Sequence, residues 1–581
     1  MFDILIKLKW YFKKHKLKYG VILVLLLMQN VLDTLPPLFL GRVIDQISSG
    51  SMTQELMWES VGLLLSIILI SYLFNYTWGY LLFGGAYDIE SIIRTRLMGK
   101  FLLLSPSFYE RNKTGDLMAK ATNDLRSVNV ALGFGVLTLL DSTVFLLTIV
   151  IVMGVTISWP LTFLAMLPLP LLAVIEAKIG KRINETHSES QKSFGAMNDS
   201  VLEVVEGVRL TRSFVQEDAE NKRFRKMTGD YLDKFMKVER LDALFRPLTI
   251  IITTASFVTA FAFGSVLVNR GQITTGDIVA FNIYLNMLVW PMFAIGMLFN
   301  IMQRGNASYN RIIDVLDVVD DVGDDAVEKI ENTSMNFSDV TFRYPTGDRE
   351  SLQDINIELK AGETLGVVGR TASGKSTLIK QLLKFYPSGS GQLIIDGVKV
   401  SELSKSELRE KIGYVSQENI LFSRTVKENI LFGRPDATEE EMFEAIRLSA
   451  FDQDLKNMPQ GLETLVGEKG VALSGGQKQR ISIARSLIKN PDILILDDAL
   501  SAVDAKTEKR IIESIQKSRA DKTTIIVTHR LSAVQHADLI IVMDDGEIIE
   551  IGDHKTLSSK EGWYSTQHSY YQTGGGPDDR V

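Results

Sequence analysis

The sequence has no cysteine among its 581 residues. This absence excludes structural disulfides and thiolate metal sites, although it does not decide the compartment in which the protein works. An excess of positive charge is also missing, because 63 Lys and Arg stand against 70 Asp and Glu, for a net charge of −7. We therefore expect no nucleic-acid partner.

Long apolar runs, in contrast, dominate the first half of the chain. Six of them approach or exceed the roughly 20 residues that a helix needs to cross a bilayer: 19–45, 57–85, 131–156, 159–179, 247–269 and 277–302. The second half is typical of a soluble α/β domain. We predict a membrane domain at 1–315, a linker at 316–333, a soluble domain at 334–570, and a flexible tail or cloning scar at 571–581.

The basic opening KLKWYFKKHKLKYG precedes the first apolar run. A signal peptide is not the interpretation we favour, because the run is long and five more follow it. The positive-inside rule predicts a cytoplasmic N-terminus. With six crossings, the C-terminus and the soluble domain are then cytoplasmic too.

Two long polar connections, 86–130 and 180–246, separate the spans on the cytoplasmic side. We expect helices that extend beyond the membrane, because structureless loops of this length are uncommon. Their tips, 105–117 and 212–224, are predicted to contact the soluble domain, and the alternative is a solvated helical surface. In the first span, the paired prolines Pro36 and Pro37 should kink the helix.

Three carboxylates, Asp33, Asp141 and Glu176, lie within or near the ends of the spans. A charge there is costly unless it faces protein or a water-filled cavity. One interpretation is a cavity that accepts cationic or polar substrates. The other is a carboxylate hydrogen-bonded between helices or at the interface, which we favour for Glu176 beside Lys178.

Residues 363–380, ETLGVVGRTASGKSTLIK, combine an apolar strand, a glycine-containing loop and a helix start. This is the phosphate-binding P-loop pattern in its expected context. The loop's backbone N–H groups and the helix N-terminus favour phosphate. Lys375 should reach the β- and γ-phosphates of ATP, and Ser376 should ligate Mg²⁺. The predicted nucleotide-binding residues are Gly369, Arg370, Thr371, Ala372, Ser373, Gly374, Lys375, Ser376 and Thr377.

Two further motifs follow the P-loop. DILILDD, at 492–498, predicts a buried strand that delivers Asp497 to the metal. LSGGQKQR, at 473–480, places a serine and two glycines at a helix start, which is a second cradle for phosphate. Because one nucleotide needs only one such cradle, the second suggests a nucleotide shared with another chain through Ser474, Gly475, Gly476 and Gln477. The alternative is an ordinary serine N-cap beside a glycine-rich loop.

The P-loop, LSGGQ, LILDD and VTHR, in this order behind six spans, resemble an ATP-binding cassette (ABC) exporter half-transporter. The resemblance covers nearly the whole chain. It implies a type I exporter membrane domain fused to an α/β P-loop cassette, with two of each in a working pump. It also implies that each ATP lies between the P-loop of one chain and the LSGGQ signature of the other.

The resemblance also implies roles for other residues. Tyr344 matches the aromatic residue that stacks on adenine, and Gln417 matches a glutamine that contacts Mg²⁺ and water. The segment 464–470 resembles a loop that contacts the partner's membrane-domain helices. Asp504 lies in a loop that crosses to the opposite ATP site, and His529 matches the histidine that senses the γ-phosphate. Structural roles for Tyr344 and His529 are the alternatives.

Asp498 departs from the family pattern, which has glutamate directly after the metal aspartate. That glutamate orients or deprotonates the attacking water, and aspartate is shorter by one carbon–carbon bond. A misplacement of about 1 Å can cost on the order of 10²-fold in rate, roughly 2.7 kcal/mol. We therefore expect a site that binds ATP well and cleaves it poorly. Ala372 is a second departure, because many members have glycine there.

The intact signature beside an altered base position resembles a subunit of the bacterial heterodimeric multidrug exporters. The expected partner is a second half-transporter with glutamate at the catalytic position. The expected location is the bacterial cytoplasmic membrane, and the expected substrates are small amphipathic or drug-like compounds. Alternatives are a homodimeric lipid or peptide exporter and, from another class, an ATP-gated channel or regulatory membrane protein.

Overall fold

The computed structural model describes residues 3–323, 329–467 and 473–572. The chain forms two compact units. Met1–Leu102 and Gly115–Val318 form a helical unit, whereas Leu103–Thr114 joins Val319–Val581 in a second unit that contains all the β-strands described.

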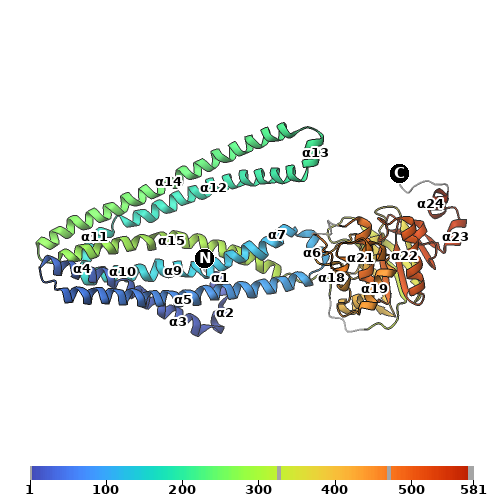
Figure 1. Ribbon diagram of the computed structural model, residues 1–581, viewed down its shortest axis with the longest axis horizontal. Coiled ribbons are helices and arrows are strands. Elements are labelled where there is room, and N and C mark those ends of the chain that lie inside the picture. Colours follow the sequence, from blue (N-terminus) through green and yellow to red (C-terminus); the bar gives the residue numbers. More distant parts are fainter. Residues whose placement is uncertain (1–2, 324–328, 468–472, 573–581) are drawn as a thin grey trace. The chain divides into compact units, whose positions relative to one another are not determined.

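The first unit consists of helices of very different length (Figure 1). Three long ones dominate it: α5 (Gln54–Leu103), α14 (Glu217–Asn269) and α15 (Thr275–Leu316). The others are α1 (Asp3–Lys7), α2 (Lys9–Lys14), α3 (Lys16–Asp33), α4 (Leu35–Ser48), α7 (Thr114–Ala119), α8 (Leu125–Leu132), α9 (Phe134–Leu140), α10 (Leu146–Met153), α11 (Trp159–Met166), α12 (Leu169–Glu206) and α13 (Val208–Ser213).

Five helical stretches among the described residues are long and apolar enough to cross a membrane: Lys16–Ser48, Gln54–Leu103, Thr114–Met166, Glu217–Asn269 and Thr275–Leu316. They contain five of the six predicted spans. The remaining one, 159–179, is divided between α11 and the start of α12. Large apolar side chains on α5 such as Leu69 and Leu73 are 67% and 59% exposed, as expected of a surface that faces lipid.

Local irregularities interrupt the third span. Three π-helical turns, η1 (Lys120–Asp124), η2 (Asp141–Phe145) and η3 (Gly154–Ser158), alternate with the α-helical segments. The expected break at Pro36 and Pro37 is confirmed, because α3 ends at Asp33 and α4 begins at Leu35 with proline in its first turn. Proline is tolerated there because the first N–H groups of a helix have no partner within that helix.

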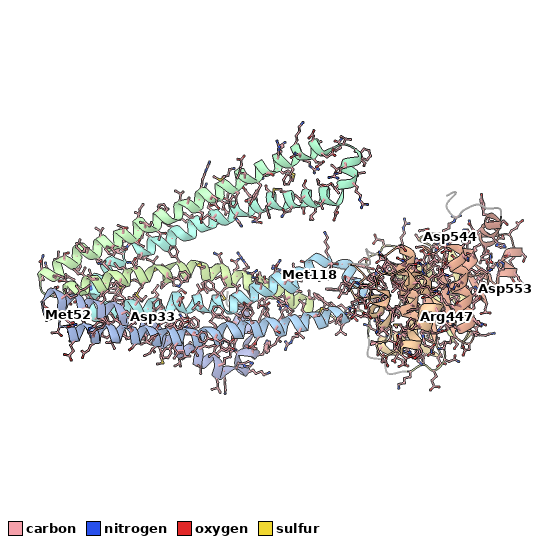
Figure 2. The ribbon with its side chains drawn as sticks, viewed as in Figure 1. Asp33, Met52, Met118, Arg447, Asp544 and Asp553 are labelled. Atoms are coloured by element: carbon pink, nitrogen blue, oxygen red, sulfur yellow. The ribbon has the colours of Figure 1, made fainter. Side chains whose placement is uncertain are left out.

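Two of the three intramembrane carboxylates are hydrogen-bonded between helices. Gln29 Nε2 donates to Asp33 Oδ2 at 3.2 Å, and the Ser71 hydroxyl donates to Asp33 Oδ1. Trp290 Nε1 donates to Asp141 Oδ2 at 3.0 Å. Figure 2 labels Asp33 among these helices. The hydrogen-bonded alternative is therefore confirmed for both, whereas the side chain of Glu176 lies outside the described residues.

Helices α12 and α14 pack along each other and are joined through α13 (Figure 1). The predicted second tip, 212–224, covers the end of α13 and the start of α14. Apolar side chains in this tip are strongly exposed, with Phe214 at 67% and Val215 at 79%, and the nearby Leu210 is 63% exposed. Its contact with a cassette stays a prediction.

The second unit is built on two sheets. A six-stranded sheet has the order β10-β9-β3-β8-β7-β6, parallel except for β10, and a four-stranded antiparallel sheet has the order β2-β1-β4-β5. The strands are β1 (Met335–Arg343), β2 (Glu350–Leu359), β3 (Thr364–Gly369), β4 (Ser390–Ile395), β5 (Val398–Lys399), β6 (Ile412–Val415), β7 (Ile493–Asp497), β8 (Thr523–Val527), β9 (Leu539–Asp544) and β10 (Glu547–Gly552). Every residue of β7 and β8 is buried, as their continuous apolar sequences predict.

Helices and short 3₁₀ turns surround these sheets. The helices are α16 (Lys375–Leu382), α17 (Lys405–Lys411), α18 (Val426–Leu431), α19 (Glu439–Leu448), α20 (Asp452–Lys456), α21 (Gly475–Leu487), α22 (Ala505–Ser518), α23 (His554–Ser559) and α24 (Trp563–Gln572). The 3₁₀ turns include η4 (Val400–Glu402), η5 (Gly461–Glu463) and η7 (Leu531–Ala533).

The second unit also contains the first predicted tip, whose short helix is α6 (Pro106–Arg111). Ser105 N donates to Asp320 Oδ1 at 3.0 Å, and the hydroxyls of Ser105 and Ser107 both donate to Asp321. The Tyr386 hydroxyl, beyond α16, donates to the Glu110 carboxylate. The predicted contact between this tip and the soluble domain is therefore confirmed within the chain.

Candidate nucleotide site

The carboxyl ends of β3, β7 and β8 bring the predicted motifs together. These strands are parallel neighbours, with β8 between β3 and β7. β3 leads into the P-loop, β7 ends at Asp497, and β8 is followed by Thr528 and His529. Parallel strands place such loops at one edge of the sheet, which is where α/β proteins bind ligands.

The P-loop folds around the ammonium group of Lys375. Lys375 Nζ donates to Gly369 O at 2.9 Å, to Arg370 O at 2.6 Å and to Ser373 Oγ at 3.3 Å. Burial lowers the pKa of Lys375, and the nearby Asp498 and Asp497 oppose that shift. The loop thus holds one cation at the start of α16, where phosphate is also favoured.

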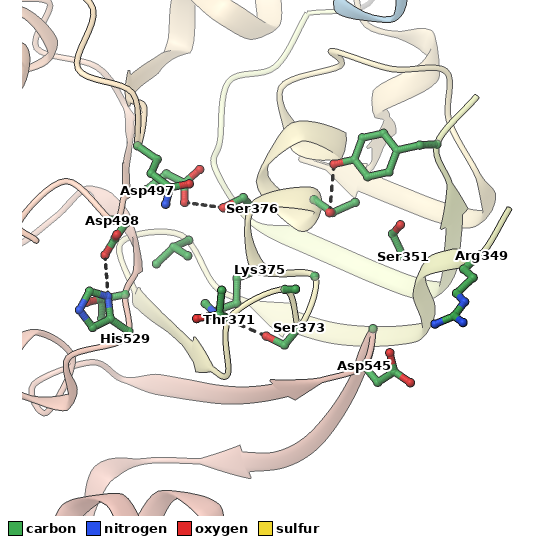
Figure 3. Close-up of a pocket in the computed structure, with 18 of the residues that line it drawn as sticks. Arg349, Ser351, Thr371, Ser373, Lys375, Ser376, Asp497, Asp498, His529 and Asp545 are labelled. Atoms are coloured by element: carbon green, nitrogen blue, oxygen red, sulfur yellow. Dashed lines mark hydrogen bonds and ion pairs between the residues drawn. The ribbon is translucent and has the colours of Figure 1, made fainter. Parts of the chain in front are cut away.

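Ser376, the residue after Lys375, is hydrogen-bonded to Asp497 at the end of β7. Ser376 Oγ donates to Asp497 Oδ1 at 2.9 Å (Figure 3). Tyr414 Oη donates to Asp497 Oδ2 at 3.3 Å. Burial raises the pKa of Asp497. A buried carboxylate beside a serine hydroxyl is the oxygen donor set that Mg²⁺ prefers, and a divalent cation would favour its ionised form. The residues therefore fit the predicted metal site.

Asp498 contacts the predicted switch histidine. His529 Nδ1 lies 3.0 Å from Asp498 Oδ1 (Figure 3). An ionised carboxylate can only accept, so Nδ1 carries the hydrogen and Nε2 is left for another partner. Asp498 N also donates to Val527 O at 2.9 Å, and the backbone of Asp498 has φ 49°. Aspartate tolerates this left-handed conformation better than most residues.

Ala372 is strained in the P-loop. Its φ is 65°, in the left-handed region that favours glycine. The sequence alone did not show whether this position needs a positive φ. The backbone conformation shows that it does. The methyl group there costs on the order of 1–2 kcal/mol.

Tyr344 lies at the opposite end of the same site. Its hydroxyl is 3.0 Å from Thr377 Oγ1, and its ring meets the Tyr386 ring edge-on, with centroids 4.9 Å apart. Tyr386 in turn donates to Glu110. Burial, together with Glu110, raises the pKa of Tyr386, which keeps its hydroxyl protonated as a donor. A chain of contacts therefore runs from the first tip to the predicted adenine-stacking residue.

These residues enclose one cavity of about 600 Å³. Of the predicted residues, it is lined by Tyr344, Thr371, Ala372, Ser373, Gly374, Lys375, Ser376, Thr377, Gln417, Asp497, Asp498 and His529. Gly369 and Arg370 are absent from the lining and instead turn their carbonyls toward Lys375.

The sequence interpretation missed several residues of this cavity. Arg349, Glu350 and Ser351 lie at the start of β2, and Asp545 and Gly546 form the turn after β9. The Asp-Gly pair is a turn signal behind an apolar strand, so it could have been noticed. The residues of β2 follow no motif, because they reach the site only through the packing of the second sheet.

The signature is not part of this cavity. Ser474 Oγ accepts from Gln477 N at 3.3 Å, and Gln477 Oε1 accepts from Ser474 N at 2.9 Å, forming a capping box at the start of α21. Ser474 and Gly475 are exposed. Asp504 caps α22 by accepting from Thr507 N at 3.0 Å. Of the segment 464–470, residues 468–470 lie outside the described part of the chain.

The contact between Glu110 and Tyr386 should help transmit movement to the membrane helices. Glu110→Ala removes a charge-assisted hydrogen bond worth about 1.5–3 kcal/mol. In an exporter of the kind that the sequence resembles, transport should therefore fall while ATP binding persists. Transport and ATPase rates measured on the same vesicles check this. Tyr386→Phe should have the same effect, and the double variant no more, because one bond is lost in all three. Additive losses would show that the two side chains act separately.

Comparison with known proteins agrees with this geometry. Residues 19–292 match the family described as ABC transporter transmembrane region, and residues 352–501 match the family described as ABC transporter. The chain is 50% identical over 574 residues to YheI of Bacillus subtilis, a probable multidrug resistance ABC transporter ATP-binding/permease protein, with 98% of each chain covered. It is 38% identical over 578 residues to MdlA of Escherichia coli, a multidrug resistance-like ATP-binding protein, with 99% and 97% covered.

A solved structure confirms the predicted fold class. A bacterial Atm1-family ABC exporter with ATP bound gives a TM-score of 0.81 at 25% identity, with 96% of this chain and 99% of that chain covered. The two matched regions follow each other in one polypeptide, as the sequence predicted. The chain therefore belongs to the ABC transporters, as an exporter of the type I fold in which the membrane domain is fused to its ATP-binding cassette.

Proposed function

We propose that this chain is one half of a heterodimeric pump that exports amphipathic, drug-like compounds across the bacterial cytoplasmic membrane. Its own ATP site is impaired because Asp498 replaces the catalytic glutamate. The observation that carries the proposal is the composition of the cavity. It contains Lys375, Asp497 and His529 but no residue of the signature, whose Ser474 and Gly475 are exposed elsewhere in the same unit.

A second chain would complete the site. A phosphate held by the P-loop needs donors on its far side, and a partner's signature supplies them at a helix start. In return, Ser474 and Gly476 of this chain would contact the partner's ATP. The exposed apolar tip at 212–224 would dock on a cassette and transmit its closure to the membrane helices.

The geometry around Asp498 supports an impaired site. A general base must lie within about 2.6–3.2 Å of the proton that it takes. Asp498 is hydrogen-bonded to His529, and a glutamate on the same backbone would extend about 1.5 Å further toward the cavity. Since the charge is the same, the shorter side chain would slow cleavage without weakening nucleotide binding.

The other residues would hold the nucleotide for the slow step. Tyr344 would stack on adenine, Lys375 would neutralise the β- and γ-phosphates, and His529 would present Nε2 to the γ-phosphate. Mg²⁺, when bound, neutralises phosphate oxygen charge, and Ser376, Gln417 and Asp497 would hold it. Asp504 would lie at the boundary with the opposite site.

Multidrug export, as opposed to another cargo, is proposed from the printed names of YheI and MdlA. The test begins with the tagged chain purified from its native membrane. We expect a second half-transporter with glutamate at the catalytic position to copurify, and drug uptake by inside-out vesicles to require hydrolysable ATP. A homodimer that hydrolyses ATP by itself would refute the heterodimer, and transport driven equally by a non-hydrolysable analogue would refute the pump.

A further inference from the structure

Two arginines, whose guanidinium groups have no partner among the described residues, line a second cavity, in the membrane unit. The cavity has a volume of about 260 Å³ and lies between η1/α8 and α15. Its lining consists of Asn123, Arg126, Ser127, Val130, Asn300, Ile301 and Arg304. None of these residues lines the nucleotide cavity.

Helix geometry explains why these side chains meet. Asn123, Arg126, Ser127 and Val130 are spaced i, i+3, i+4 and i+7, so they share one helix face. Gly305 lets α15 approach that face, because a Cβ there would lie 2.3 Å from Ala131 Cβ. The cavity thus lies beside a close helix crossing, and the π-helical turn η1 contributes Asn123 to it.

A neighbouring arginine on α15, Arg311, has the kind of carboxylate partner that Arg126 and Arg304 lack among the described residues. Arg311 Nε donates to Asp124 Oδ2 at 2.9 Å, and Ser308 Oγ donates to Asp124 Oδ1 at 2.9 Å. Within the part of the chain that the structure describes, no hydrogen bond or ion pair joins the guanidinium group of Arg126 or of Arg304 to another residue. Two guanidinium groups that share one small cavity repel each other, and an anion between them would convert that repulsion into charge-assisted hydrogen bonds.

The position of the cavity indicates where the anion comes from. Arg126 precedes the apolar run 131–156, and Arg304 follows the run 277–302, so both lie at one end of their spans. From Arg304 the chain continues through α15 to the cassette, which places this end on the cassette side. On each helix an apolar lining residue, Val130 or Ile301, lies on the membrane side of the arginine. The lining is therefore basic toward water, whereas toward the bilayer it consists of Val130 and Ile301 together with the neutral polar Asn300.

We propose that this cavity binds the phosphate of an anionic phospholipid from the leaflet that faces the cassette. Arg126 and Arg304 would hold the phosphate, Asn123 and Ser127 would bond to the glycerol headgroup, and Val130 and Ile301 would contact the first acyl carbons. Basic pockets between transmembrane helices on the cytoplasmic side bind lipid headgroups in this way. The assignment of that leaflet as cytoplasmic rests on the proposed function, but binding itself does not require ATP hydrolysis.

Native mass spectrometry of the intact complex in nanodiscs of equal phosphatidylglycerol and phosphatidylcholine tests this proposal. The wild-type complex should retain phosphatidylglycerol preferentially. The double variant Arg126→Gln, Arg304→Gln should lose that preference, with affinity lower on the order of tenfold or more, because charge-assisted bonds are lost. Arg182→Gln, at an exposed arginine on α12, is the matched control and should behave as wild type.

Other outcomes would overturn the proposal. Equal retention of phosphatidylglycerol by wild type and the double variant would exclude the lipid site. Displacement of the lipid by soluble glycerol phosphate at the same concentration would show a site for free anions. Loss of the partner chain from the double variant would show that the arginines pair with that chain. Nucleotide binding is measured on the same samples. A variant that loses the lipid but still binds nucleotide concerns the lipid site alone, so a failure of the lipid proposal can be told apart from a failure of the proposed pump.

Discussion

Replacing Gly476 with glutamate should reduce the ATPase activity of the assembled pair nearly to background, although Gly476 lies outside the cavity of this chain's own P-loop. In the proposed pump, this position contacts the γ-phosphate of the partner's ATP, which occupies the competent site. Loss of a phosphate contact made in the transition state costs about 2.7–4 kcal/mol, roughly 10²–10³ in rate. The new carboxylate adds repulsion against phosphate. Steady-state ATPase of the co-expressed, purified pair measures the effect.

Crowding could complicate this variant, because a Cβ at Gly476 would lie 3.0 Å from Ala502 O. Ser474→Ala provides a second test, with Thr438→Ala as its matched control. Both positions are N-caps in capping boxes, so each change should cost about 1 kcal/mol of helix stability. Only Ser474→Ala should also lower ATPase activity. Equal effects of the two would assign Ser474 a capping role alone.

Replacing Lys375 with alanine should sharply weaken ATP binding at this chain's site. Lys375 is half-buried, and its ammonium group holds the P-loop through Gly369 and Arg370 and would face the phosphates. Loss of charged hydrogen bonds of about 1.5–3 kcal/mol predicts an affinity roughly 10- to 100-fold lower. Photolabelling with an azido-ATP, followed by separation of the two subunits, reports on each site individually.

Asp498→Asn is the matched variant for that experiment. Asparagine keeps the length of the side chain and can still bond to His529, so labelling of this chain should persist. Labelling of the partner should be similar in both variants. Abolished labelling in Asp498→Asn would mean that this residue holds the nucleotide and is not in the base position.

Local patterns in the sequence predicted much of the nucleotide cavity. The P-loop spacing sets the loop and helix start, and the apolar runs of β7 and β8 end at the polar residues that line the site. Such features depend on neighbours along the chain, so a single sequence contains them. The proline break before α4 is local in the same sense.

Features that depend on packing could not be predicted in this way. Tyr386 and Glu110 are 276 residues apart, and their contact exists only because the first tip packs against the cassette. The positive φ of Ala372 is set by the path of the loop. A glycine would have signalled that conformation in the sequence, whereas an alanine does not. The pairing of Asp33 with Ser71 and of Asp141 with Trp290 depends on how the helices cross.

The most direct test of the unequal ATP sites is the ATPase activity of the purified pair with Asp498→Ala. A base that is already misplaced can be removed at little cost, so the variant should keep most of the wild-type activity. Removal of the partner's catalytic glutamate should instead cost on the order of 10² or more in rate. If Asp498→Ala proves as inactive as Gly476→Glu, then Asp498 is a working base and this chain's ATP site is not impaired.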